Sequence, residues 1–171
     1  DYTDKLAATH VLNLQLFEFG FILSYSYGLI SSILIPRSKD PSFVIKRLHK
    51  WGFLVSTIVA TIHLFGFKIL RFFTSDTQIL MHSNMLIPIG ALFQAVNTFT
   101  CINEGTSQGL GMYKVLGSGA ALALAFFSLI INKTSNLQEI WVGFIMCALI
   151  RIYVNIHFIG SKLKNIKSRN D

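Results

Sequence analysis

The sequence predicts an all-α integral membrane protein, a bundle of five transmembrane helices joined by short loops. Three observations support this fold class. Of the 171 residues, 52% are hydrophobic and only 13% are charged, whereas an average soluble domain carries about 25% charged residues. The mean hydropathy is +0.54. The charged residues also gather in short clusters between long apolar runs, as spans and loops require.

Five apolar segments each approach the roughly 20 residues that cross a hydrocarbon core. Backbone amides cannot stay unpaired in lipid, so each segment is expected to be helical. Glu104 and Gly105 are expected in the loop after the third span, and the whole chain forms one transmembrane domain. The expected spans are residues 10–35, 48–70, 79–100, 112–131 and 139–160, followed by a basic C-terminal tail, 161–171.

The basic residues predict the topology. We call the end of the bundle that holds the loop between the first two spans the B end, and the opposite end the A end. The A end carries Lys5, Lys68, Arg71 and Lys133. The B end carries Arg37, Lys39, Lys46, Arg47, Lys50, Lys114, Lys162, Lys164, Lys167 and Arg169. The positive-inside rule therefore places the B end and the C-terminus on the cytoplasmic or matrix side, and the N-terminus on the outer or lumenal side.

Two further features bear on location and partners. The glycosylation triplet Asn132-Lys133-Thr134 falls at the A end, which agrees with an outer or lumenal position. The net charge of +7 does not indicate nucleic acid, because the basic residues cluster at span ends and are not interleaved with aromatic residues. Anionic lipid headgroups explain this distribution, so the expected partner is the bilayer.

Histidines inside or beside the spans are the main functional candidates, because ionisable groups in lipid are costly. A neutral imidazole binds haem iron, and two from facing helices can clamp it. By their positions, His10 and His82 lie at the A end, and His49 and His157 lie near the B end. His63 follows His49 by about 21 Å of helix and lies nearer the A end. Spacing alone leaves another interpretation open, in which these histidines are interfacial residues that are hydrated, capped or bonded to lipid phosphate.

Other polar and small residues in the spans have structural interpretations. Glu18 is expected to pair with Arg151 or Lys68, with a proton relay as the alternative. The run from Gly117 to Ala121 is expected to be a close-packing face. Cys101 and Cys147 are expected to remain unpaired, and Gln94, Asn97 and Asn155 to form hydrogen bonds between helices. The sequence contains no P-loop, HExxH, GxSxG or GxGxxG motif.

Four short motifs, three of them around these histidines, occur in a defined order along the chain. The motifs are His10-Val11-Leu12 with Phe19-Gly20 following, Leu48-His49-Lys50-Trp51, Met81-His82-Ser83 and Tyr113-Lys114-Val115-Leu116-Gly117. Their order and spacing resemble the core of the cytochrome b-561 family, including its ferric reductase and DOMON-associated members. The third motif resembles the family's Leu-His-Ser, and the fourth its Tyr-His-x-x-Leu-Gly with lysine at the ligand position. The resemblance covers residues 8–131, with the last span as the family's closing helix.

The resemblance implies a b-type haem electron carrier. In the family the first and third core histidines share one haem, which here would be His10 and His82. His49 would lose its partner at Lys114, because a lysine amine is protonated near neutral pH. One haem b is therefore implied and the second is in doubt. Three alternatives are open for the B end. The haem there is absent, or His157 replaces the missing ligand, or the whole bundle has lost haem and kept its fold. The family's usual first helix would precede His10, and the sequence given begins at Asp1.

The implied function is electron transfer from a small reductant such as ascorbate or a quinol, or from a redox partner. The alternative is a non-catalytic accessory or scaffold subunit that binds other membrane subunits. Lys114 and the short loops favour this alternative. A transporter or channel is a third and weaker interpretation, because it depends on Glu18 and Arg151 alone.

Overall fold

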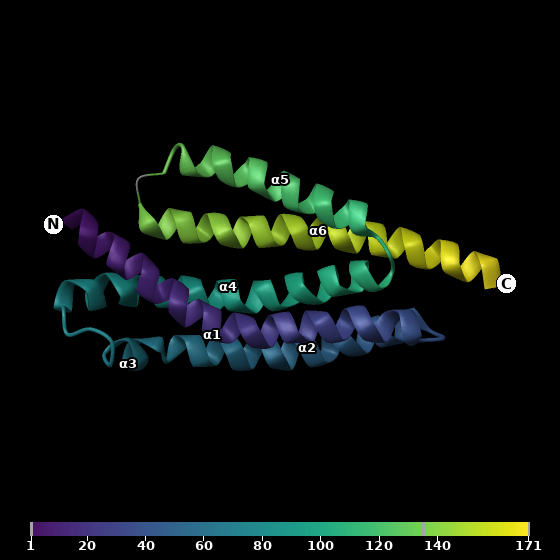
Figure 1. Cartoon of the computed structure of the whole chain (residues 1–171), viewed down its shortest axis with the longest axis horizontal. Coiled ribbons are helices and arrows are strands. Elements are labelled where there is room, and N and C mark those ends of the chain that lie inside the picture. The colour runs from purple at the N-terminus through teal and green to yellow at the C-terminus, as the bar shows by residue number, and fades with distance from the viewer. Residues whose placement is uncertain (1, 135, 171) are drawn as a thin grey trace.

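The computed structural model describes residues 2–134 and 136–170 and consists, over these residues, of helices without strands. The long helices lie side by side along one axis, with the N-terminus at one end and the C-terminus at the other (Figure 1). The helices are α1 (Tyr2–Arg37), α2 (Pro41–Leu64), α3 (Gly66–Leu70), α4 (Thr77–Gly109), α5 (Tyr113–Ile131) and α6 (Leu137–Asn170).

Four helices are long and apolar enough to cross a membrane: Thr3–Arg37, Thr77–Gly109, Tyr113–Ile131 and Leu137–Ile166. The prediction of an all-helical fold is confirmed over the described residues, and these four helices suggest a multi-pass membrane protein. The structure does not confirm the fifth span. α2 carries Lys46, Arg47 and Lys50 in its first half, which lowers its hydropathy.

Aspartates cap the helices that follow two of the turns. The Asp40 side chain accepts a hydrogen bond from the Phe43 N–H, and Pro41 begins α2. The Asp76 side chain accepts hydrogen bonds from the Gln78 and Ile79 N–H groups at the start of α4. These bonds, with the nearby Lys5 ammonium, lower the pKa of Asp76. Lys5 also forms an ion pair of 3.2 Å with Asp76, which ties the start of α1 to the start of α4.

Several expected boundaries are wrong. α4 continues to Gly109, so Glu104 and Gly105 are helical and not in a loop. α1 begins eight residues before the expected first span. α2 begins at Pro41, and a break at Phe65 separates it from α3. α6 continues to Asn170, so residues 161–170 of the expected tail are helical and residue 171 lies outside the described residues.

α1 and α4 pack closely through glycines and run in the same direction. A Cβ atom on Gly28 would lie 2.7 Å from the Cys101 carbonyl oxygen, and one on Gly105 would overlap the Gly28 carbonyl. The residue numbers of the contacting pairs increase together along α1 and α4, from Gly20 against Gln94 to Ile35 against Gly109. This is the small-residue helix packing typical of membranes. Because α1 and α4 are parallel, α2 and α3 must bring the chain back from the B end to the A end.

α5 lies at the edge of the bundle and packs mainly on α6 (Figure 1). Gly119 faces Val154 of α6 at 3.5 Å from an added Cβ, but Gly117 has no neighbour within 4 Å of one. Ser118, Ala120 and Ala121 are exposed. The expected close-packing face from Gly117 to Ala121 is therefore wrong except at Gly119, because a peripheral helix buries only one narrow stripe.

Candidate functional sites in the bundle

His10 and His82 lie at the A end of parallel helices, close to the Lys5–Asp76 ion pair. The Nδ1 atom of His10 is buried and has no hydrogen-bond partner among the described residues. The His10 ring packs edge-on against Trp141 of α6, with the ring centroids 6.1 Å apart. Trp141 belongs to a cluster of apolar side chains in this half of the bundle, with Phe17, Leu86, Phe93 and Phe144.

His82 lines a cavity of about 320 Å³ between the N-terminal parts of α1, α4 and α6. Leu6 contributes from α1, one turn before His10, and Leu137 contributes from α6, one turn before Trp141. The cavity also includes the polar side chains of Asn136 and Gln138. The two histidines thus reach the same three-helix region, His82 at the cavity wall and His10 one turn from it.

His63 lies near the A end of α2, as its spacing predicts, but it lines none of the cavities described for this part of the chain. It is 2% exposed, and its Nε2 atom lies where a Cβ on Gly90 of α4 would be. Neither ring nitrogen has a hydrogen-bond partner among the described residues. Gly90 therefore makes room for this ring, and any side chain there would push it away.

At the B end, hydrogen bonds occupy both ring nitrogens of His49. Nδ1 lies 2.9 Å from the Ile45 carbonyl oxygen, and Nε2 lies 3.2 Å from Oδ1 of Asn103. The Asn103 amide nitrogen donates to the Phe99 carbonyl at 2.8 Å, which fixes its oxygen toward His49. Both ring nitrogens of His49 therefore already have hydrogen-bond partners within the described part of the protein.

Neither Lys114 nor His157, the two residues considered as second ligands, is brought to His49. Lys114 is exposed at the start of α5. His157 is also exposed, and its ring packs against Tyr153 and Phe158 of its own helix.

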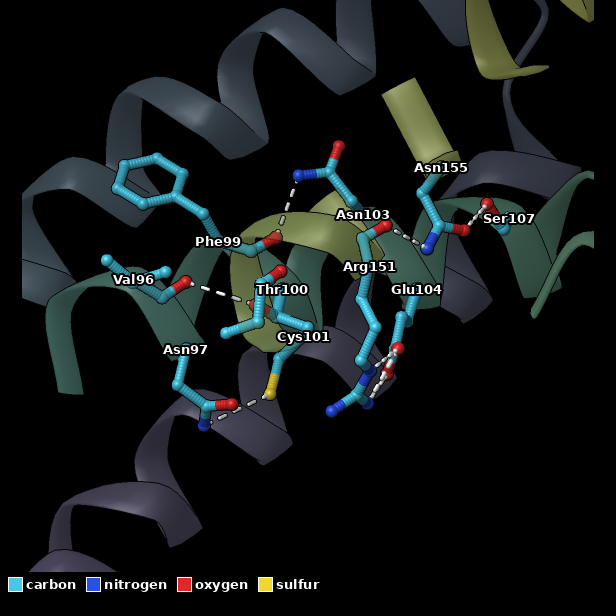
Figure 2. A network of polar contacts seen from close by, with 11 residues as sticks. Val96, Asn97, Phe99, Thr100, Cys101, Asn103, Glu104, Ser107, Arg151 and Asn155 are labelled. Atoms are coloured by element: carbon cyan, nitrogen blue, oxygen red, sulfur yellow. Dashed lines mark hydrogen bonds and ion pairs between the residues drawn. The ribbon is translucent and has the colours of Figure 1, made fainter. Parts of the chain in front are cut away.

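An ion pair inside the bundle joins α4 to α6 (Figure 2). Nε of Arg151 donates to Oε1 of Glu104, and Nη2 donates to Oε2, both at 2.7 Å. The two side chains are 34% and 22% exposed. The expected pairing of Glu18 with Arg151 or Lys68 is wrong, because the continuation of α4 brings Glu104 against Arg151 instead.

The ion pair is part of a polar stripe along α4 and α6. One turn toward the B end, Ser107 Oγ donates to Asn155 Oδ1 at 2.5 Å, and the Asn155 amide donates to the Arg151 carbonyl at 2.8 Å. On the other side, Thr100 Oγ1 lies 3.5 Å from the Ala148 carbonyl. The prediction that Asn155 bonds between helices is confirmed. Glu104 and Ser107 were not predicted as interhelical contacts, although both lie at helical spacing from Thr100.

Of the other two residues predicted to bond between helices, Gln94 does so and Asn97 does not. Nε2 of Gln94 donates to the Phe17 carbonyl of α1 at 2.5 Å, so this interhelical bond is confirmed. Asn97 instead contacts Cys101 of its own helix. Cys101 and Cys147 are both free thiols. Among the described residues, no group of three or more His, Cys, Asp and Glu side chains is placed to hold a metal ion, a criterion that a bis-histidine site does not meet.

Comparison of this chain with protein-family models, with curated proteins and with solved structures found no match.

Proposed function

We propose that α2 and α3 together form a fifth span. α1 and α4 are parallel neighbours, so the chain between them returns along the full length of the bundle. Residues 51–67 contain no Asp, Glu, Lys or Arg. The length of this uncharged segment is near the minimum length of a membrane span. The outer face of this segment is apolar, with exposed Trp51, Phe53, Ile58 and Ile62. With this span, the B end carries most of the basic residues and belongs on the cytoplasmic or matrix side.

We propose that the bundle carries electrons by means of one b-type haem at the A end, held by His10 and His82. The observation that carries this proposal is the position of His10, whose buried Nδ1 has no partner among the described residues, one helical turn from Leu6 in the cavity that His82 lines. Buried polar atoms without partners are uncommon and call for an explanation. Apolar walls from Leu6, Leu86 and Leu137 suit a porphyrin, and Gln138 offers an amide donor for a propionate.

We propose one haem and not two. His49 has both nitrogens bonded, and Lys114 and His157 are exposed. A haem bound at the A end would supply reversible one-electron chemistry there. His10 and His82 would hold the iron, and Trp141 would exclude water from one side. The electron donor would be a small reductant such as ascorbate or a quinol, or a redox partner, on the A side.

Variants of the histidines test the haem proposal. His82→Ala should abolish the reduced b-type absorbance bands of protein purified from haem-replete cells, because one axial ligand is lost. His157→Ala and His63→Ala should keep the haem, since neither side chain reaches the A-end cavity. The measurement is the dithionite-reduced minus oxidised spectrum with haem stoichiometry per chain. Unmodified protein without b-type bands, or full haem content in His82→Ala, would contradict the proposal.

A second candidate function is that of an accessory subunit, and Glu18 favours it. Glu18 is exposed on the outside of α1 and lines a groove of about 310 Å³ with apolar residues of α1 and α3. Its carboxylate forms no hydrogen bond or ion pair within the described part of the chain. A carboxylate that faces lipid is costly, so a partner helix with a lysine opposite Glu18 would be stabilised there.

A model peptide tests this second candidate in vesicles. A Leu-Ala transmembrane helix with a single lysine should associate with the protein, as followed by energy transfer between labels on the two. Glu18→Gln should weaken this association several-fold, whereas Glu139→Gln, which removes an exposed carboxylate at the start of α6, should not. Equal association of both variants, or of a peptide without the lysine, would rule out recognition by Glu18.

A further inference from the structure

A groove between α1 and α2 opens at the B end of the bundle. Its volume is about 460 Å³, the largest of the cavities described. Most of its wall is apolar or aromatic, and its charged residues are two arginines near the α1–α2 turn. The residues that form the apolar wall are Ile30, Leu34, Phe43, Val44, Leu48 and Trp51, and the charged residues are Arg37 and Arg47.

The two arginines of the groove have no carboxylate partner among the described residues. Arg37 ends α1 and Arg47 lies in the second turn of α2, and both are exposed. Neither guanidinium forms a hydrogen bond or an ion pair with any residue that the structure describes. Asp40, the acidic residue in the turn between them, uses its side chain to cap α2. The groove therefore presents two unpaired guanidinium groups to an incoming ligand.

Along α1 the polar residues of the groove lie at the turn and the apolar residues lie deeper, whereas on α2 the apolar Phe43 and Val44 lie nearer the turn than Arg47. Arg47 and Ser38 lie toward the turn, and Trp51 lies one helical turn, about 6 Å, deeper. Trp51 is 52% exposed, as is typical of tryptophan at a membrane interface. Leu34 and Ile30 continue the apolar wall along α1. The order along α1, together with the step from Arg47 to Trp51 on α2, matches a ligand with an anionic head and a long apolar tail.

We propose that this groove binds an anionic phospholipid of the B-side leaflet, with its phosphate between Arg37 and Arg47 and one acyl chain against Trp51 and Leu34. Guanidinium groups bind phosphate oxygens in a bidentate manner, and basic grooves between helices on the cytoplasmic or matrix side suit anionic headgroups. A free phosphate would use only the arginines and leave the apolar wall uncovered. The site does not depend on haem at the A end.

Trp51 makes the proposal testable by fluorescence. The chain has two tryptophans, and the second, Trp141, is 1% exposed near the A end. In a Trp141→Phe background, Trp51 is the sole reporter. Phosphatidylglycerol with brominated acyl chains, in phosphatidylcholine vesicles, should quench Trp51 more than the same fraction of brominated phosphatidylcholine. Adding inorganic phosphate should leave this excess quenching unchanged.

Matched charge variants complete the test. Arg37→Gln/Arg47→Gln should lower the relative association constant for the brominated anionic lipid about tenfold. Lys39→Gln/Lys46→Gln removes the same charge from exposed positions that do not line the groove, and should leave the constant within about twofold. Equal losses in both variants would mean general surface attraction and overturn the site. Absence of excess quenching, or its removal by inorganic phosphate, would also overturn the proposal.

Discussion

Replacing Arg151 with methionine is expected to lower the free energy of unfolding by about 3 kcal/mol or more, because it leaves the Glu104 carboxylate without its partner inside the bundle. Both charge-assisted hydrogen bonds of 2.7 Å are lost. Asn155, whose amide donates to the Arg151 carbonyl, keeps that bond, so the effect reports on the side-chain pair. The measurement is unfolding in mixed micelles of increasing dodecyl sulfate content, followed by far-UV circular dichroism.

A double variant distinguishes lost charge pairing from lost packing. Glu104→Leu/Arg151→Met removes both charges and should recover most of the stability, because apolar side chains of similar size often replace an ion pair at little cost. Lys68→Met removes an exposed basic residue and should change stability by no more than about 0.5 kcal/mol. A double variant as unstable as Arg151→Met would show that the ion pair itself is not what stabilises this contact.

The Glu104–Arg151 pair also shows which features of the fold could be predicted from the sequence and which could not. Long apolar runs predicted the spans, but residues 101–109 are polar and contain two glycines, so they resemble a loop. Packing against α1 and α6 keeps them helical. The available signal was periodicity: Thr100, Glu104 and Ser107 lie at helical spacing, as do Ala148, Arg151 and Asn155 of the facing helix.

For the histidines, too, the sequence predicted the position along the helix but not the neighbouring side chains. The positions of His10 and His82 along the spans predicted their common end of the bundle, and the polar side chains Gln94 and Asn155 were identified as interhelical contacts. The bonding of His49 to Asn103 could not be predicted, because it depends on the rotation of α2 about its axis relative to α4. Hydropathy gives the depth of a residue and not the neighbour that it faces. Haem binding at His10 and His82 stays a prediction.

Small-residue spacing has the same weakness, because it does not say which helices are neighbours. The run at Gly117 is more conspicuous in sequence than the series Gly20, Ser24, Gly28 and Ser32 of α1. Only the second series meets another backbone, since α1 lies against α4 and α5 lies at the edge. Ser24 within this series also bonds to Thr98 of α4 at 2.8 Å, so the close approach is reinforced by an interhelical hydrogen bond.

Gly105→Leu is expected to disrupt the α1–α4 contact, because even the first carbon of the new side chain overlaps the Gly28 carbonyl. A flexible neighbour could move aside, but this neighbour is backbone of a buried helix. The expected loss of stability is at the upper end of the range for overpacking, about 3 kcal/mol. Gly105→Ala should already be destabilising, although alanine has the higher helix propensity. Dodecyl sulfate unfolding measures both variants.

Gly117→Leu is the matched control, since it makes the same substitution in a helix where an added Cβ meets no atom within 4 Å. It should be neutral or slightly stabilising, because leucine favours both helix and lipid. The opposite ranking, with Gly117→Leu the more damaging, would mean that α5 and not α1 provides the close helix contact of this bundle. The order of the two leucine variants therefore tests the close packing of α1 against α4.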